Sequence, residues 1–189
     1  MLNLKRLFDL ALSVPLIIIL IPLFFFISIF IKLDSRGSIF FISKRVGING
    51  NKFKMYKFRT MYMDTKLIES NKIKLSDKKI TRMGNFLRKY SLDELPQFIN
   101  VIIGDMSLVG HRPSLFSQKE LNNSRKKIGI DRLKPGITGL AQISGRDLID
   151  INKKLQFETE YLNNNNLLVD FIILVKTFKI VVTRKGVLH

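Results

Sequence analysis

Several residue types are missing or rare in this chain of 189 residues, which has no cysteine, no tryptophan and two histidines. The absence of cysteine excludes disulfide frameworks, thiolate zinc sites and cysteine nucleophiles. The two histidines are His111 and His189, the last residue. Histidine-based acid–base catalysis is therefore not expected, and His111 is interpreted as a loop residue.

Acidic residues are also scarce, because 15 Asp and Glu stand against 32 Lys and Arg, a formal net charge of +17. An excess of this size favours an anionic partner, which could be a nucleic acid, an acidic lipid surface or a phosphorylated substrate. Hydrophobic residues make up 46% of the chain, so it is not a disordered basic tail. The length fits one domain of ordinary size.

One segment lacks ionisable side chains altogether. It runs from residue 10 to residue 31 and is long enough to cross about 30 Å of hydrocarbon as a helix. Basic residues, which prefer the cytoplasmic side of a membrane, occur on both flanks, with Lys5 and Arg6 before the run and Lys32 after it. A helix that enters, bends near Pro22 and returns is therefore favoured over a kinked single span.

Asp9 lies three residues after Arg6, close to the start of the apolar run. At helical spacing the two side chains can form an ion pair at the membrane interface, which lowers the cost of burying either one. An exposed interfacial Asp9 is the alternative.

The sequence after the apolar run predicts a mixed domain. Residues 38–43 and 51–61 are typical of two strands of a hairpin, joined by a turn at Gly47–Gly50. The expected fold class is α+β and predominantly helical. A re-entrant, monotopic membrane helix (1–33) precedes a compact cytoplasmic domain (34–189) that contains the short hairpin and interfacial helices.

Helical periodicity also covers residues 85–103, with an interruption at Ser91–Pro96. The stretches dense in Gly and Pro, 107–113 and 134–146, are expected to be loops. Three further helices are expected, at residues 118–127, 147–162 and 167–182. The last of them is expected to lie along the membrane interface or to pack on the core.

The hexapeptide Ser91–Pro96 (SLDELP) contains two adjacent carboxylates. Ser91 and Glu94 match a capping box; alternatively, Asp93 caps the helix and Pro96 falls in its first turn. Either arrangement places Asp93 and Glu94 at a helix N-terminus, which stabilises ionised carboxylates, as a nucleophile or a metal ligand requires. Helix capping without catalysis is the alternative interpretation.

Basic residues and glycine-rich segments accompany the acidic pair in the sequence. Arg88 precedes it, and residues 110–113 (GHRP) and 135–139 (PGITG) provide Arg112 and exposed backbone donors. Arginine holds a phosphate bidentately, and glycine lets main-chain N–H groups approach its oxygens. Two carboxylates, a divalent cation and basic side chains are the components of phosphoryl transfer from a nucleotide-linked donor.

Six blocks, in their order and spacing, carry a resemblance to a known family: Lys5–Asp9, Lys57–Met61, Ser91–Leu95, Asn100–Gly110, Arg112–Pro113 and Lys134–Gln142. Over nearly its whole length the chain resembles the small monotopic phosphoglycosyl transferases among the bacterial sugar transferases. The resemblance implies transfer of a sugar 1-phosphate from a UDP-sugar to polyprenol (undecaprenyl) phosphate, with release of UMP. It also implies a re-entrant membrane helix and a place at the cytoplasmic face of the bacterial inner membrane, where lipid-linked glycan assembly starts.

The same resemblance implies roles for individual residues. Asp93 would be the nucleophile that forms a covalent aspartyl phospho-sugar intermediate, and Glu94 together with Asp93 would hold Mg²⁺. Arg112 would bind phosphate oxygens. Further residues implied for the phosphate or nucleotide pocket are Arg88, Lys57, Arg59, Pro113, Gly136, Gly139 and Gln142.

Three positions depart from the pattern of the family. Ile21 precedes Pro22 where a serine is frequent, and His111 stands where proline is frequent. Glu158 occupies a position where aspartate is expected, so its role at the site stays open.

Two alternative functions are compatible with these residues. In a direct, sequential transfer, Asp93 and Glu94 would serve as Mg²⁺ ligands only. A membrane-tethered module that binds nucleic acid or anionic lipid would explain the charge and the aromatic-basic segment Phe53–Arg59, but not the acidic pair, which repels phosphate. The expected partners are thus a UDP-sugar, polyprenol phosphate and membrane lipids, without nucleic acid; a homodimer would be unsurprising.

Overall fold

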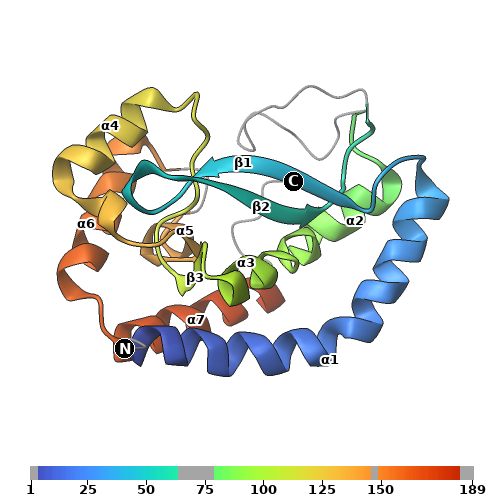
Figure 1. Cartoon of the computed structure of the whole chain (residues 1–189), viewed down its shortest axis with the longest axis horizontal. Helices are drawn as coiled ribbons and strands as arrows, with labels where there is room; N and C mark the ends of the chain where they lie inside the picture. Colours follow the sequence, from blue (N-terminus) through green and yellow to red (C-terminus); the bar gives the residue numbers. More distant parts are fainter. Residues whose placement is uncertain (1–3, 64–78, 146–148, 184–189) are drawn as a thin grey trace.

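The computed structural model describes residues 4–63, 79–145 and 149–183. Its longest element is helix α1 (Leu4–Asp34), which among the described residues is the one helix long and apolar enough to cross a membrane. The helix bends near its middle (Figure 1), and it contains Pro15 and Pro22, each of which removes a backbone donor. Most of its side chains are exposed; the buried ones are Asp9, Ser13, Ile27 and Ile31.

Strands β1 (Phe40–Val46) and β2 (Lys52–Phe58) form the predicted antiparallel hairpin, which is confirmed. A short 3₁₀ turn, Ile48–Gly50, connects them. In the register of the hairpin, Arg45 pairs with Phe53 and Ser43 pairs with Met55. Since Phe53 and Met55 are buried in the main core, this face of the hairpin covers the domain.

The segments 107–113 and 134–146 were expected to be loops, and this expectation is wrong in part. They contain a parallel pair of three-residue strands, β3 (Ser107–Val109) and β4 (Gly136–Thr138), followed by helix α5 (Leu140–Ile143). The backbones lie very close, because a Cβ added at Gly136 would stand 2.1 Å from the Gly110 nitrogen. Glycine here permits strand packing.

The interrupted helical segment is confirmed in outline. Helix α2 (Arg82–Lys89) begins at Thr81, whose side chain accepts a hydrogen bond from the Gly84 N–H, and helix α3 (Gln97–Ile103) ends at Gly104. Between them lies a 3₁₀ turn, η3 (Leu92–Glu94).

The predicted capping box is wrong. Ser91 has a left-handed backbone (φ 56°) and its side chain makes no cap, and Pro96 precedes α3 without a side-chain cap. The reason is that the chain turns sharply between α2 and α3 instead of continuing as one helix. The two carboxylates consequently lie in this tight turn.

The three further predicted helices are confirmed to within a few residues as α4 (Lys119–Ile128), α6 (Ile151–Asn164) and α7 (Leu167–Thr183); residues 147 and 148, where the second was predicted to begin, lie outside the described residues. A 3₁₀ turn that was not predicted, η4 (Ile130–Arg132), follows α4. Helix α6 is capped by the Asp150 carboxylate, which accepts from the Lys153 N–H. Helix α7 exposes a series of large apolar side chains: Leu167, Leu168, Phe171, Ile172, Val175, Phe178 and Val182.

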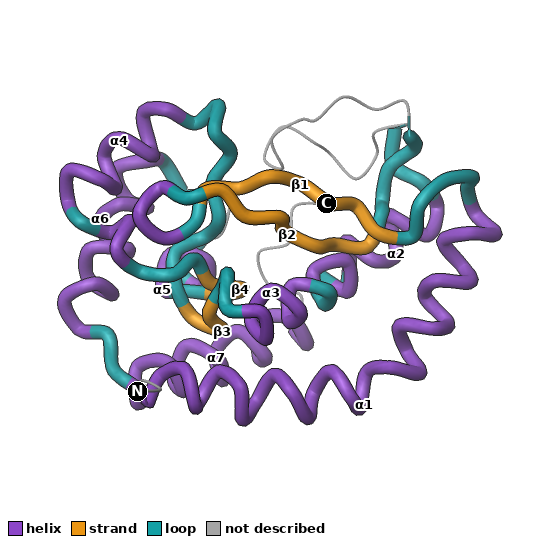
Figure 2. Tube along the Cα trace, in the orientation of Figure 1, coloured by secondary structure: helices purple, strands orange, loops and turns teal. Residues whose placement is uncertain are grey.

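Two apolar clusters hold these elements together. The main one lies beneath the hairpin and joins it to α3, β3, α6 and α7 (Figures 1 and 2). Its buried members are Phe53, Met55, Val101, Met106, Leu108, Val109, Tyr161 and Ile173. The smaller cluster joins the second half of α1 to the hairpin and to α2 through Ile27, Ile31, Phe58 and Leu87.

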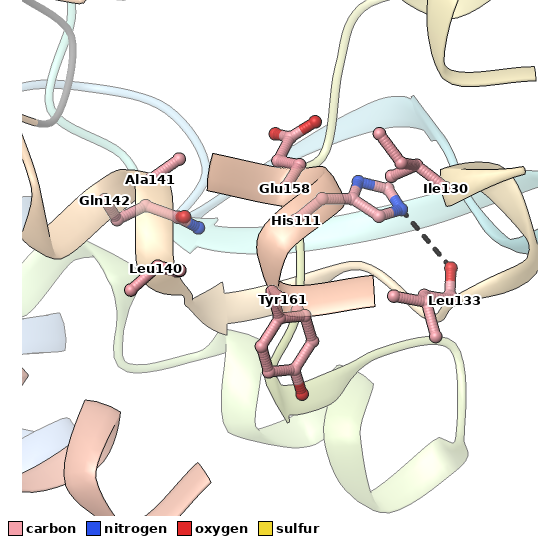
Figure 3. Close-up of a pocket in the computed structure, with 9 residues that line it drawn as sticks. His111, Ile130, Leu133, Leu140, Ala141, Gln142, Glu158 and Tyr161 are labelled. Atoms are coloured by element: carbon pink, nitrogen blue, oxygen red, sulfur yellow. Dashed lines mark hydrogen bonds between the residues drawn. The ribbon is translucent and has the colours of Figure 1, made fainter. Parts of the chain in front are cut away.

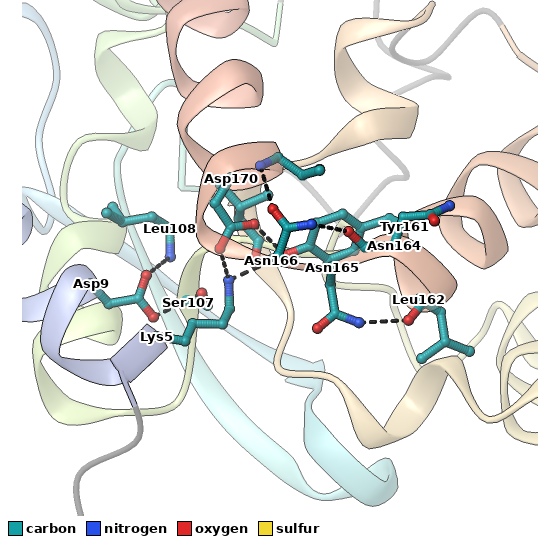
Figure 4. A network of polar contacts seen from close by, with 12 residues as sticks. Lys5, Asp9, Ser107, Leu108, Tyr161, Leu162, Asn164, Asn165, Asn166 and Asp170 are labelled. Carbon is teal, nitrogen blue, oxygen red and sulfur yellow. Dashed lines mark hydrogen bonds and ion pairs between the residues drawn. The ribbon is translucent and has the colours of Figure 1, made fainter.

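The first turns of α1 are fixed to the domain by polar side chains. The Arg6 guanidinium donates to the carbonyls of Val101 and Ile102, in the last turn of α3, where carbonyls have no partner within the helix. The Asp9 carboxylate accepts from Ser107 Oγ (2.8 Å) and from the Leu108 N–H (3.1 Å), as Figure 4 shows. The expected Arg6–Asp9 pair and its alternative, an exposed Asp9, are both wrong, because each side chain finds a backbone partner in the domain.

The far end of α1 is fixed to the same domain. Asp34 accepts a hydrogen bond from the Met83 N–H at the start of α2 (2.8 Å). The buried Arg59 donates to the carbonyls of Ser35 (2.7 Å) and Arg36 (2.9 Å), just beyond the end of α1. Both ends of the apolar helix are therefore bound to one folded unit.

Candidate active site

The two adjacent carboxylates in η3 meet basic side chains from two other parts of the chain. The Lys57 Nζ, from β2, lies 2.6 Å from Glu94 Oε1, and the Arg112 Nη2, from the segment after β3, lies 3.5 Å from the same oxygen. Asp93 is only 9% exposed. Arg88 also interacts electrostatically with Asp93, so the structure brings together five of the residues singled out in the sequence.

The electrostatic environment of Asp93 suits a reactive carboxylate. Burial raises its pKa to about 6, Lys57 opposes this rise, Glu94 adds to it, and Arg88 and Arg112 oppose it. Around neutral pH the carboxylate is therefore mostly ionised although it is poorly hydrated. A poorly hydrated anion held among three cations is a group from which a nucleophile can be made.

Arg88 is positioned from α2, where its Nε donates to Thr60 Oγ1 (2.9 Å). Arg59, expected at the phosphate pocket, is not brought into this cluster. Its guanidinium is occupied with the carbonyls at the end of α1, because it follows the last residue of β2 and is buried against that helix. Arg88 thus lies beside Asp93, whereas Arg59 lies at the end of α1.

Gly136 and Gly139 are buried, and so are the polar atoms of the Gln142 amide. A Cβ on Gly139 would stand 2.0 Å from the Gly110 oxygen, so this glycine, like Gly136, allows close backbone packing. Figure 3 shows the Gln142 amide at a small cavity of about 10 Å³ that Glu158 and Tyr161 also line. Within the described residues the amide has no hydrogen-bond partner, and the cavity has room for about one water.

His111 also lines this small cavity and is buried. Its ring nitrogens lie 3.2 Å from the Leu133 carbonyl oxygen and 3.4 Å from that of Arg112 (Figure 3 shows the first). Burial lowers the pKa of His111 to about 3, and the charge of Arg125 adds to this effect. The imidazole is therefore neutral at physiological pH and helps to hold the loop that carries Arg112.

Comparison with known proteins assigns the chain to a family. The sequence model described as "Bacterial sugar transferase" matches residues 1–184. The chain belongs to the bacterial sugar transferase family. This sugar transferase is 39% identical over 197 residues to an exopolysaccharide production protein, ExoY, from Sinorhizobium fredii, an alignment that covers 96% of the chain and 87% of the relative.

Two other relatives differ in length. An uncharacterized sugar transferase, EpsL, from Bacillus subtilis is 38% identical over 97% of this chain and 90% of its own length. An undecaprenyl-phosphate galactose phosphotransferase from Salmonella typhimurium is 38% identical over 97% of this chain but over 41% of its own length. The resemblance to the bacterial sugar transferases and the expected phosphoglycosyl transferase class are thus confirmed.

The sugar transferase also contains a buried arginine, Arg125, that the sequence alone did not single out, and its partner is Glu158, whose role the sequence left open. Arg125 of α4 and Glu158 of α6 form a buried ion pair with contacts of 2.5 and 2.8 Å. The helical spacing could have indicated that both charged side chains face the interior. Arg125 follows the buried Leu121 by one helical turn, and Glu158 precedes the buried Tyr161 by three residues, so each shares a helix face with a buried side chain. The open role of Glu158 is thereby answered, because its carboxylate holds Arg125.

A second network joins α1 to α6 and α7. Lys5 Nζ lies 2.5 Å from the Asp170 carboxylate and 3.1 Å from the Tyr161 hydroxyl, which in turn donates to Asp170 (2.6 Å; Figure 4). Burial and the hydrogen bond with Asp170 raise the pKa of Tyr161, so the phenol stays protonated. Local spacing does not reveal this network, because its members are far apart in the chain.

The acidic pair fits a magnesium ion by its donor chemistry. The described residues contain no cluster of three or more His, Cys, Asp or Glu side chains that could hold a metal on their own. Mg²⁺, however, is usually held by one or two carboxylates, several waters and the phosphates of a substrate. Asp93 and Glu94 match that requirement.

Proposed function

We propose that this sugar transferase is a phosphoglycosyl transferase that moves a sugar 1-phosphate from a UDP-sugar to polyprenol phosphate and releases UMP. The observation that carries the proposal is the buried Asp93 carboxylate, held in a tight turn among Lys57, Arg88 and Arg112. The acceptor is supported by relatives that are named as undecaprenyl-phosphate glucose and galactose phosphotransferases.

The reaction has two half-reactions, both at the phosphorus that bears the sugar. In the first, an Asp93 carboxylate oxygen attacks this phosphorus, a new O–P bond forms, and the bond to the bridging oxygen breaks. UMP leaves with the electron pair of that bond. In the second, a phosphate oxygen of the polyprenol phosphate attacks the same phosphorus, and the Asp93 carboxylate is released.

The basic side chains stabilise the charge that moves during these steps. Arg112 binds oxygens of the donor, while Lys57 holds the Glu94 carboxylate in place through their ion pair. Asp93 and Glu94 would hold Mg²⁺, which when bound neutralises the charge of the pyrophosphate.

We place the enzyme at the cytoplasmic face of the bacterial inner membrane, with α1 as a re-entrant helix. Both ends of α1 bind the same folded domain, Arg6 and Asp9 at one end and Asp34 and Arg59 at the other. A helix tied in this way cannot leave its ends on opposite sides of a membrane. The strongly basic chain favours the cytoplasmic side.

This arrangement explains how one site serves a soluble and a lipid substrate. The exposed apolar side chains of α1 and α7 contact the hydrocarbon, while the acidic pair is carried by the polar part of the domain. The UDP-sugar arrives from the water and the polyprenol phosphate from the bilayer.

The test uses the full chain in lipid nanodiscs with a UDP-sugar and no acceptor. UMP release and the intact protein mass are measured for the wild type, for Asp93→Asn and for Glu160→Gln, an exposed carboxylate on α6 that serves as control. We expect about one UMP per enzyme and a phospho-sugar adduct for the wild type and the control, and neither for Asp93→Asn.

Two results would contradict the proposal. Wild-type rates of UMP release by a folded Asp93→Asn variant would exclude Asp93 as the nucleophile. UMP release that starts only after polyprenol phosphate is added, without any adduct before, would favour direct sequential transfer. Screening several UDP-sugars in the same assay identifies the donor.

A further inference from the structure

A groove of about 460 Å³ adjoins the acidic pair. Its lining comes from the segment after β3, from α4 and from the start of α6, together with Arg45 of β1. Arg112 belongs to this lining and also lies 3.5 Å from Glu94, so the groove opens beside the site of phosphoryl transfer. We propose that Arg45 and Arg112 together hold the phosphate of the UMP half of the donor, with the nucleoside in this groove. The inference rests on the proposed function and adds Arg45 as a binding residue.

The hairpin positions Arg45 for this role. In β1, Arg45 and Ser43 lie on the face that also carries Phe53, Met55 and Lys57 of β2. The Arg45 Nε donates to Ser43 Oγ (3.2 Å), and the neighbouring Val46 N–H donates to the Ser114 carbonyl (3.1 Å). The second bond joins β1 to the segment that follows Arg112. Two arginines from distant parts of the chain therefore line the same groove.

Their proximity is unfavourable without an anion. Both side chains are partly buried, and their positive charges repel each other. Burial lowers the pKa of Arg45 to about 10, the charge of Arg112 lowers it further, and Glu94 raises it. The Glu94 carboxylate also forms an ion pair with Lys57, whose Nζ lies 2.6 Å from Glu94 Oε1, so its charge is shared among several cations. A phosphate dianion between the two guanidinium groups would reverse the sign of this interaction, because each can donate two hydrogen bonds to it.

The composition of the groove favours the nucleotide over the lipid. Among the described residues, the lining includes none from α1 or α7, the helices that expose large apolar surfaces. It combines apolar side chains such as Pro113, Leu115 and Ile149 with polar ones such as Gln118, as small-molecule sites do. A volume of about 460 Å³ is in the range of such sites.

The geometry of the reaction favours the nucleotide over the sugar. In phosphoryl transfer the leaving oxygen lies opposite the attacking one. With Asp93 as the attacking group, UMP leaves on the side away from Asp93. Arg112 interacts with Glu94 and lines the groove, so it is placed to receive the phosphate that leaves.

The experiment compares Arg45→Gln with Lys44→Gln. Lys44 is the preceding residue of β1; it is exposed and lies on the opposite face of the hairpin, so the control removes the same charge without touching the groove. Binding of UMP, uridine and galactose 1-phosphate to the full chain in nanodiscs is measured by calorimetry, and the KM for the UDP-sugar by UMP release. The melting temperature without ligand is recorded for each protein.

We expect Arg45→Gln to weaken UMP binding by about 10- to 100-fold and to raise the KM, because a charge-assisted contact to phosphate is lost. Lys44→Gln should change UMP binding less than about twofold. Uridine, which has no phosphate, should bind equally weakly to all three proteins. The melting temperature of ligand-free Arg45→Gln should equal or exceed that of the wild type, since the repulsion between the Arg45 and Arg112 charges is removed.

Three results would overturn the inference: unchanged UMP affinity in Arg45→Gln, weaker binding of galactose 1-phosphate but not of UMP, or a loss of UMP binding together with a lower melting temperature without ligand. The last would show that Arg45 only maintains the fold. If the wild type forms the adduct and turns over while one of these is found, Arg45 alone is wrongly assigned. If the wild type releases no UMP from any UDP-sugar, the proposed function itself fails.

Discussion

Removal of the Glu158 charge is expected to destabilise the protein strongly. Glu158 and Arg125 have side chains only 2% and 3% exposed, and two contacts of 2.5 and 2.8 Å join them. In Glu158→Gln, Arg125 keeps its charge in the interior without a counter-charge, which costs about 3–5 kcal/mol. For a chain of this size, 1 kcal/mol shifts the melting temperature by about 2–4 °C, so a decrease of about 6–20 °C is expected.

Thermal unfolding in nanodiscs, followed by intrinsic fluorescence or circular dichroism, measures this shift. Glu160→Gln, on the same helix but exposed, serves as the control and should leave the melting temperature within about 2 °C. The double variant Arg125→Met, Glu158→Leu should recover much of the loss, because it removes both buried charges and keeps the volume. A loss below about 1 kcal/mol in Glu158→Gln would refute the reasoning, since the interior would then accept an unpaired arginine.

Two further predictions concern pH and the anchoring of α1. The folded protein lowers the pKa of His111 from 6.5 to about 3, so the stability that the neutral imidazole contributes is complete above pH 6.5 and is lost as the pH falls towards 3. The free energy of unfolding should therefore decrease by about 2 kcal/mol between pH 7.5 and pH 5. His111→Gln should make the melting temperature depend less on pH over this range. Asp9→Ala leaves the Leu108 N–H and the Ser107 hydroxyl without their acceptor, so we expect a loss of about 1–3 kcal/mol and faster hydrogen exchange in β3, whereas unchanged exchange would show that Asp9 does not anchor α1.

Much of the fold could be predicted because its signals are local. The apolar run, the aromatic-basic alternation of the hairpin and the helical periodicities each reflect neighbours in the sequence. The strands β3 and β4 could not be predicted in this way, because three residues are too few for an alternating pattern and their glycines are typical of loops. Their pairing depends on contacts between segments that are far apart in the chain.

In the candidate site, too, some residues could be predicted from the sequence, while the positions of others depend on contacts in the fold. The sequence singles out Asp93 and Glu94, because two adjacent acids in so basic a chain are conspicuous, and Arg112, because it lies in a short motif. The structure brings these three side chains together, and their roles stay predictions. Arg59 was misjudged, since sequence proximity to Lys57 does not say which element the side chain contacts. Arg45, which we propose as a binding residue, could not be singled out for a related reason: its position at the groove depends on the register of the hairpin and on the bond between Val46 and Ser114.

The attachment of Arg6 to α3 has a consequence for the height of the reaction above the lipid. Helix α3 has seven residues, so it is about 10 Å long, with the Arg6 contacts in its last turn and the acidic pair just before its first. In a re-entrant arrangement α3 therefore acts as a rigid spacer between the depth of α1 and the position of Asp93. Bilayers of different thickness would then leave this height unchanged, and it is the polyprenol phosphate head group that must rise to meet the enzyme.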